Sequence, residues 1–282
     1  MFKSYLKTGI LLAILTALLL FIGNLIGGYS GLIIAGIFVL LMNFGSYFFS
    51  DKIVLWMYHA KPAGKLEYLW LHKIVEELAK KSRLPKPKLY IIPLKISNAF
   101  ATGRGPKHSA VAVTEGIIRN LSKDELRGVL AHELAHIKNR DVLIMTIAAT
   151  IAGTISYIAS MARWAAIFGT GRDNEGNNLI SLLVLAIVAP IAALLIQLAI
   201  SRTREYAADE SGARIIGDGI PLANALLKLE EEAKTKPLRA SGYESTAHLF
   251  IVNPFRGGFA SLFSTHPPIT LRVEKLRKLK FD

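Results

Sequence analysis

The feature that most constrains the fold is a run of 43 residues, Thr8 to Ser50, that contains no Asp, Glu, Lys or Arg. As one helix it would be about 65 Å long, roughly twice the hydrocarbon core of a bilayer. Since a single straight span cannot use that length, the segment Gly27–Gly31 is predicted to divide it into a hairpin of two membrane helices. Lys3 and Lys7 precede the run, but a second span follows at once, so we interpret it as an uncleaved anchor.

Two further apolar stretches, Val142–Ala162 and Gly176–Ser201, are each long enough to cross a bilayer. A short polar loop, residues 170–176, separates them. Of the 34 basic residues, only Arg163 and Arg172 fall in or between these stretches, and the others flank the four predicted spans on one side. The positive-inside rule makes that side cytoplasmic, with both chain termini there, and predicts a multi-pass inner-membrane protein.

Composition restricts the remaining possibilities. Hydrophobic residues make up 52% of the chain and charged residues 20%, which excludes disorder and a uniformly soluble globule. With no cysteine, any metal must be bound by His, Asp or Glu. The net charge of +13 indicates anionic lipid headgroups as partners, and no nucleic-acid partner is expected because no recognition motif accompanies the charge.

The predicted organisation has four parts. Residues 1–50 and 142–200 form the two membrane hairpins, and residues 51–141 and 201–282 form a single cytoplasmic domain that is split in the sequence. The fold class is therefore a mainly α membrane protein with four transmembrane helices and an α+β cytoplasmic domain.

Local patterns predict the elements of that domain. Apolar residues recur at helical spacing over 65–81, which predicts an amphipathic helix. Residues 89–92 and 110–113 are strand-like. Ser122-Lys123-Asp124-Glu125 is a capping box, so a helix should begin near Lys123 and continue through the 130s. Aromatic residues near the exit of the second span are interpreted as interfacial anchors: Trp56, Tyr58, Tyr68 and Trp70.

The capped helix contains His132-Glu133-Leu134-Ala135-His136. Histidines four residues apart share one helix face and can bind one cation, and Glu133 can reach water bound to that cation. This is the HExxH motif of zincin metalloproteases, which arises by chance roughly 0.01 times in a chain of this composition. The alternative is an exposed helix face with two unrelated histidines.

A catalytic zinc needs a third protein ligand and an open position. Directly after the fourth predicted span, Glu205 and Asp209 share a helix face, which makes Glu205 a candidate metal ligand and Asp209 a candidate acceptor for a ring N–H of a ligand histidine. The alternative is a pair of solvated carboxylates near Arg202 and Arg204. Asp141 is a weaker candidate for supporting a ligand, and a structural role at the membrane entry is equally consistent with its position.

Five stretches carry a family resemblance that covers nearly the whole chain: His132–His136, Asp141, Ser201–Asp209, Asn98–Ala101 and Ser264-Thr265-His266-Pro267-Pro268. Together with the paired N-terminal spans they resemble the HtpX heat-shock family of membrane zinc metalloproteases. The CAAX prenyl proteases carry similar motifs but more spans, so the four predicted spans favour the HtpX branch.

The resemblance implies a gluzincin site with one Zn²⁺ bound by His132, His136 and Glu205, with Glu133 as catalytic base and Asp209 supporting a ligand. It also implies that the substrates are misfolded or damaged membrane proteins, cleaved at the cytoplasmic face as part of quality control.

Two other segments receive roles in the reaction. His266, stiffened by the two prolines that follow, is predicted to stabilise the tetrahedral intermediate, the alternative being an ordinary turn histidine. Residues Asn98, Ala99, Phe100 and Ala101 are predicted to form an edge strand that aligns an extended substrate through its backbone. The alternative for this segment is a buried strand end containing Phe100.

Two other classes of function could also use these residues. A zinc-binding scaffold or pseudoprotease is disfavoured by Glu133, because a structural zinc site needs no base and normally fills all four coordination positions. A metal transporter should carry its ionisable ligands at mid-membrane depth, whereas these lie beyond the ends of the predicted spans.

Overall fold

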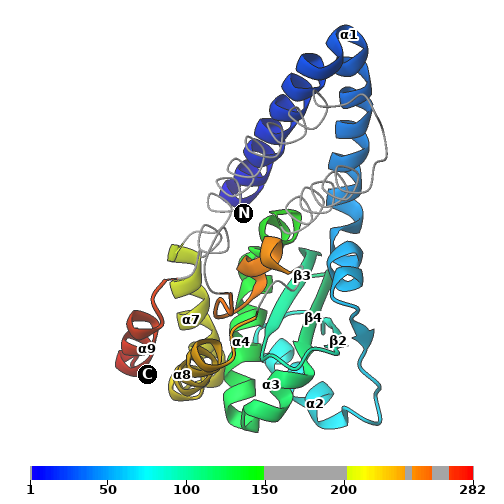
Figure 1. Cartoon of the computed structure of the whole chain (residues 1–282). Helices are drawn as coiled ribbons and strands as arrows, with labels where there is room; N and C mark the ends of the chain where they lie inside the picture. The colour runs from blue at the N-terminus through cyan, green and yellow to red at the C-terminus, as the bar shows by residue number, and fades with distance from the viewer. Residues whose placement is uncertain (1, 149–201, 239–242, 256–266, 282) are drawn as a thin grey trace.

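The computed structural model describes residues 2–148, 202–238, 243–255 and 267–281 (Figure 1). Most of the second predicted membrane hairpin and His266 lie outside these residues. The described parts form a long helical hairpin and, below it, a domain of helices and one small sheet.

Helix α1 (Phe2–Met57) forms the hairpin. The chain reverses at the top of Figure 1, and Gly28, inside the predicted break, has the left-handed φ of 53° that glycine adopts without strain. The helix continues past Ser50, where the sequence predicted a boundary, because Val54 and Leu55 are buried in the domain core. Counted over the described residues alone, no helix is long and apolar enough to cross a membrane.

The sheet has the order β1-β2-β4-β3, in which β2 and β4 are parallel and the other pairs are antiparallel. Its strands are β1 (Lys61–Pro62), β2 (Lys88–Ile92), β3 (Ala99–Gly105) and β4 (His108–Thr114). Both strand-like runs of the sequence are confirmed as β2 and β4. Strand β3, which contains most of the Asn98–Ala101 segment, lies at one edge of the sheet.

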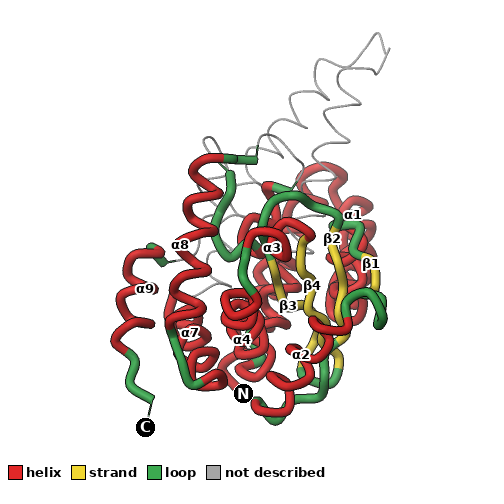
Figure 2. The backbone as a smooth tube through the Cα atoms, turned by 90° about the horizontal axis from the view of Figure 1, so that it is seen from below, coloured by secondary structure: helices red, strands yellow, loops and turns green. Residues whose placement is uncertain are grey.

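The helices pack mainly beside β3 rather than around the sheet. Figure 2 places α4 next to β3, with α7, α8 and α9 beyond it. These helices, with α2, α3 and one 3-10 turn, have the bounds α2 (Leu69–Lys81), α3 (Glu115–Asn120), α4 (Lys123–Asn139), α7 (Arg202–Ile216), α8 (Ile220–Thr235), η1 (Glu244–Leu249) and α9 (Ile269–Lys278). Helix α2 begins four residues later than predicted, because the residues before it form a turn in which the Tyr68 N–H donates to the Gly64 carbonyl.

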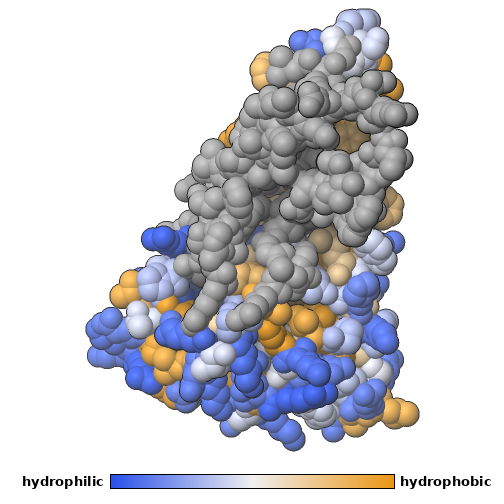
Figure 3. All heavy atoms as spheres, in the orientation of Figure 1, coloured by the Kyte–Doolittle hydropathy of each residue, from blue (hydrophilic) through white to orange (hydrophobic). Residues whose placement is uncertain are grey.

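On the face drawn in Figure 3, hydrophilic side chains gather over the lower part of the domain, away from the hairpin.

A second buried cluster joins the end of α1 to β3 and η1. Tyr58 is 1% exposed, stacks on Tyr243 with ring centroids 4.8 Å apart, and lies 2.6 Å from Thr246 through its hydroxyl. Its interpretation as an interfacial anchor is therefore wrong, because the buried rings of Phe100 and Phe250, the partly buried ring of Tyr243 and a hydroxyl partner surround it. Trp56 is exposed, whereas Tyr68 and Trp70 pack partly buried against the main core.

Helices α4 and α7 approach closely at a glycine. A Cβ atom added to Gly212 would lie 2.9 Å from the backbone nitrogen of His132, closer than real Cβ contacts. Because the obstacle is backbone and not a flexible side chain, any larger residue at 212 must push the two helices apart.

We expect Gly212→Ala to lower the free energy of unfolding by about 1–3 kcal/mol, the usual cost of overpacking. Thermal or denaturant unfolding in detergent would measure it. The matched control is Gly64→Ala, whose new Cβ would make an ordinary 3.7 Å contact with Glu67 and should change stability little. Equal stability of the two variants would show that the close approach is not a constraint.

Candidate active site

A capping box fixes the residue at which helix α4 begins, and so fixes where the HExxH motif lies along the helix. The predicted capping box is present: Ser122 Oγ accepts a hydrogen bond from the Glu125 N–H, and Glu125 Oε2 accepts one from the Ser122 N–H. The helix ends at Asn139, and the next residue, Arg140, has a left-handed φ of 61°. His132, Glu133 and His136 are all at most 4% exposed.

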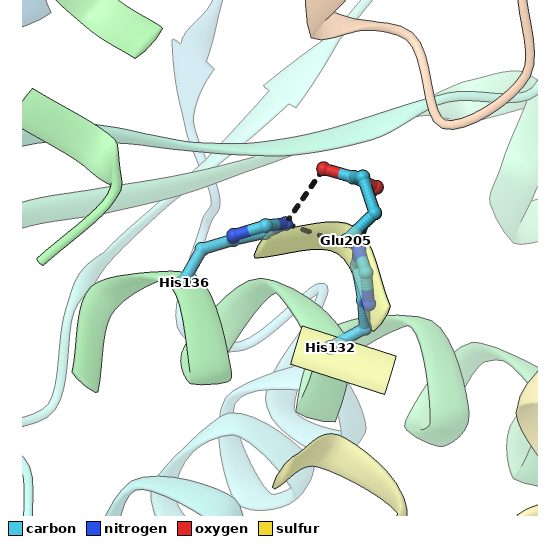
Figure 4. Close-up of side chains that lie close together, drawn as sticks. All are labelled: His132, His136 and Glu205. Atoms are coloured by element: carbon cyan, nitrogen blue, oxygen red, sulfur yellow. Dashed lines mark hydrogen bonds and ion pairs between the residues drawn. The ribbon is translucent and has the colours of Figure 1, made fainter. Parts of the chain in front are cut away.

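Glu205 of α7 completes a cluster with the two histidines. The Nε2 atoms of His132 and His136 lie 3.2 Å apart, and the Glu205 carboxylate lies 3.5 Å from His136 Nε2 and 3.7 Å from His132 Nε2 (Figure 4). All three side chains are buried, and their ligand atoms lie within 4.8 Å of one another. In the sequence, the whole second apolar hairpin separates Glu205 from this motif. The fold nevertheless brings together the three residues that the sequence predicted to be metal ligands.

The cluster fits a tetrahedral metal ion. Zinc binds His nitrogen and carboxylate oxygen at about 2.0–2.2 Å, which places tetrahedral ligand atoms about 3.4 Å from each other. The two Nε2 atoms lie 3.2 Å apart, and a different oxygen of Glu205 faces each ring, with Oε1 3.5 Å from His136 Nε2 and Oε2 3.7 Å from His132 Nε2, so each separation is close to that value. Two imidazoles and one carboxylate are also the donor set of catalytic zinc sites that keep one position open.

Each histidine has a carboxylate behind its other ring nitrogen. Asp209 Oδ1 lies 3.0 Å from His132 Nδ1, and Asp141 Oδ2 lies 3.4 Å from His136 Nδ1. Such partners fix the tautomer and orientation of a ligand imidazole. Asp209, and also Asp141, the weaker candidate from the sequence, thus lie where they can orient a histidine.

Arg272 of α9 is a member of the site that the sequence analysis missed. Its guanidinium is fully buried, donates to both oxygens of Asp209 at 2.8 and 2.7 Å, and has Nη1 3.5 Å from Glu205 Oε2. A signal existed: Arg272 occupies the apolar stripe of its helix, shared with Ile269, Val273 and Leu276. A charged residue on a core-facing stripe indicates a buried ionic partner.

The charges in the site shift its pKa values in ways that follow from burial and neighbours. Burial raises the pKa of Glu133, against the opposing influence of the two histidines and the Ala101 N–H. Burial alone lowers the pKa of His136, but the carboxylates of Asp141, Glu205 and Glu133 outweigh it and raise that pKa to about 9. For Asp209, burial is outweighed by the charge and hydrogen bonds of Arg272, which lower its pKa.

Edge strand β3 contacts the site directly. The Ala101 N–H donates to Glu133 Oε2 at 2.7 Å. Asn98 is buried and tied elsewhere, with Nδ2 donating to the Leu249 carbonyl and Oδ1 accepting from the Ile251 N–H. Ala99 and Phe100 are also buried, so this segment is both an edge strand and part of the core.

Comparison with known proteins identifies the family. The profile of Peptidase family M48 matches residues 65–280. The chain belongs to this family. It is 54% identical to a protein named Protease HtpX homolog from Pyrococcus furiosus, over 99% of this chain and 96% of that one, and 55% identical to the homolog of the same name from Pyrococcus abyssi, with the same coverage.

The resemblance to the HtpX family is thus confirmed, and this member of family M48 is a metalloendopeptidase. A crystal structure of S. mikatae Ste24p aligns with a TM-score of 0.50 at 18% identity, over 98% of this chain and 67% of that one. At that identity the likeness concerns the fold alone.

We expect the metal to stabilise the folded protein. Adding Zn²⁺ at 100 times its Kd to chelator-treated protein should stabilise it by about 2.7 kcal/mol, seen as a higher Tm. His132→Ala should lose that shift, while His108→Ala, which changes an exposed histidine of β4, should keep it. A full zinc shift in His132→Ala would remove His132 from the metal site.

Proposed function

We propose that this protein is a membrane-bound zinc endopeptidase that cleaves misfolded or damaged polypeptides, including membrane proteins, at the cytoplasmic face. The observation that carries the proposal is the buried cluster of His132, His136 and Glu205 with Glu133 beside it. Membership of family M48 supports peptide-bond hydrolysis by this cluster.

His132, His136 and Glu205 would hold the zinc ion. When bound, zinc supplies a water molecule with a pKa near 7 and polarises the scissile carbonyl. The carboxylates of Asp209 and Asp141 keep the Nε2 atoms of the two histidines pointed at the ion, because they face the opposite ring nitrogens.

Glu133 is the proton carrier. Its Oε2 accepts the Ala101 N–H, which fixes the carboxylate plane and leaves Oε1 to take a proton from the attacking water. Glu133 then returns the proton to the leaving amine. Burial raises the pKa of Glu133, and a raised pKa favours the transfer of a proton to this carboxylate.

Strand β3 and His266 are the proposed partners of the substrate. The edge position of β3 suits an extended polypeptide that adds as a further strand, a mode that reads backbone more than side chains and therefore accepts many unfolded sequences. We assign His266 to stabilising the oxyanion, on the basis of its sequence context alone.

Membrane attachment is supported by the sequence and by the surface of α1. Large apolar side chains exposed along its second arm include Ile33, Ile34, Ile37, Leu40, Leu41 and Phe44. A contiguous apolar surface of this kind is stable in contact with lipid rather than water. We propose that residues 1–50 and 142–200 provide four spans, with anionic headgroups meeting the surplus of basic residues.

Glu133→Gln should separate a protease from a zinc-binding scaffold. Loss of the base should slow hydrolysis of casein by about 10²–10⁴-fold while zinc content stays at one per chain. Glu210→Gln, which changes an exposed carboxylate on α7, is the control and should retain activity. Wild-type protein that holds zinc but cleaves nothing would favour the scaffold.

The absence of cysteine allows a direct test of orientation. A single cysteine introduced as Asp173→Cys, in the loop between the third and fourth predicted spans, should react with an impermeant maleimide added outside intact cells. Lys80→Cys, exposed on α2, should react only after permeabilisation. The reverse labelling pattern would place the active site on the other side of the membrane.

A further inference from the structure

We infer that Arg272 is a positioning residue for the metal site, which acts by clamping Asp209 and through it the imidazole of His132, while placing positive charge beside Glu205. This inference rests on the zinc site proposed above. It assigns to α9, which carries none of the proposed metal ligands, a defined part in holding the metal.

The burial of Arg272 demands an explanation. A guanidinium in a fully buried position loses its hydration, and an apolar side chain of similar volume is usually as stable or more so. The other core-facing residues of α9, including Ile269, Val273 and Leu276, are apolar, as packing alone would favour. An arginine in this stripe therefore serves the carboxylates it contacts.

The geometry of the contact transmits orientation. Nε and Nη2 of Arg272 bind the two oxygens of Asp209 at 2.8 and 2.7 Å, so the carboxylate cannot rotate. The same Oδ1 lies 3.0 Å from His132 Nδ1. Fixing Asp209 thereby holds a carboxylate beside Nδ1 of His132, on the side of the ring opposite the Nε2 that faces His136 and Glu205.

The third nitrogen completes the arrangement. Nη1 of Arg272 lies 3.5 Å from Glu205 Oε2, so one guanidinium faces both the orienting carboxylate and the carboxylate ligand. A lysine ammonium, a single point charge on a flexible stem, cannot hold both carboxylates in this way.

A similar chain of contacts, with longer distances, runs from Arg204 through Asp141 to His136 Nδ1. Arg204 Nη1 is 3.9 Å from Asp141 Oδ1, and Asp141 is 3.4 Å from His136 Nδ1. The Arg204 side chain is 15% exposed, whereas that of Arg272 is 0% exposed. Because charge interactions strengthen with burial and shorter distance, the Arg272 arm should be the stronger of the two.

The test is zinc affinity, measured on full-length protein in detergent by competition with a chromophoric chelator. Arg272→Met should raise the Kd for Zn²⁺ by about 10–100-fold, the usual effect of removing a group that orients a metal ligand. Arg204→Met should raise it less. The matched control on the same helix is Arg277→Met, which removes an exposed cation and should leave the Kd unchanged.

Because Arg272→Met leaves Asp209 buried without its partner, the variant can fail to fold. Arg272→Lys keeps a charge beside Asp209 and serves as the second variant. It should fold, as judged by circular dichroism, and still bind zinc about 10-fold more weakly, because the two-pronged contact is lost.

The outcomes separate this inference from the proposed function. If wild-type protein binds no zinc, the proposed site itself is wrong. If wild-type protein binds zinc and hydrolyses casein while folded Arg272→Lys binds zinc with the wild-type Kd, then Arg272 has a structural role only and the inference is overturned.

Discussion

The packing of α7 against α4 is the contact on which the site depends. Glu205 and Asp209 reach the histidines only because Gly212, further along the same helix, lets the two backbones approach without an intervening side chain. The same face of α7 therefore carries the proposed third ligand Glu205, the proposed orienting carboxylate Asp209 and the glycine that sets their distance from α4. A small increase in the distance between α4 and α7 would therefore displace all three residues from the histidines together.

A second constraint is electrostatic. Glu133, Asp141, Glu205 and Asp209 are buried within one small region, and isolated buried carboxylates are strongly unfavourable. Two histidines and the guanidiniums of Arg204 and Arg272 face them. Counted with the carboxylates ionised and both histidines neutral, as metal ligands must be, four carboxylates and two guanidiniums leave two negative charges. A divalent cation would neutralise them, so the charge of this group of residues matches that of the proposed metal.

Much of the site could be predicted because its signals are local. The HExxH spacing, the capping box and the pair Glu205 and Asp209 each lie within one helix, where periodicity determines which side chains share a face. The proximity of α4 and α7 followed from the second predicted membrane hairpin between them, because two crossings return the chain to the same side of the membrane. The start of α2 was misjudged because a turn competed with the helical pattern.

Arg272 and Tyr58 escaped prediction for a different reason. Tyr58 was interpreted as an interfacial ring and Arg272 received no role, whereas tertiary partners distant in sequence decide the positions of both. For Tyr58 those partners are Tyr243 and Thr246, and for Arg272 they belong to α7. No pattern within one segment specifies such pairs.

The order of elements along the chain has a consequence for biogenesis. Helix α9 follows α4 and α7 in the sequence, so a ribosome exposes the HExxH helix and the Glu205 helix before the arginine that braces them. During that interval Asp209 and Glu205 lack the guanidinium that contacts both of them in the folded protein. The contacts that α9 makes with α7 therefore form last among those described around the histidines.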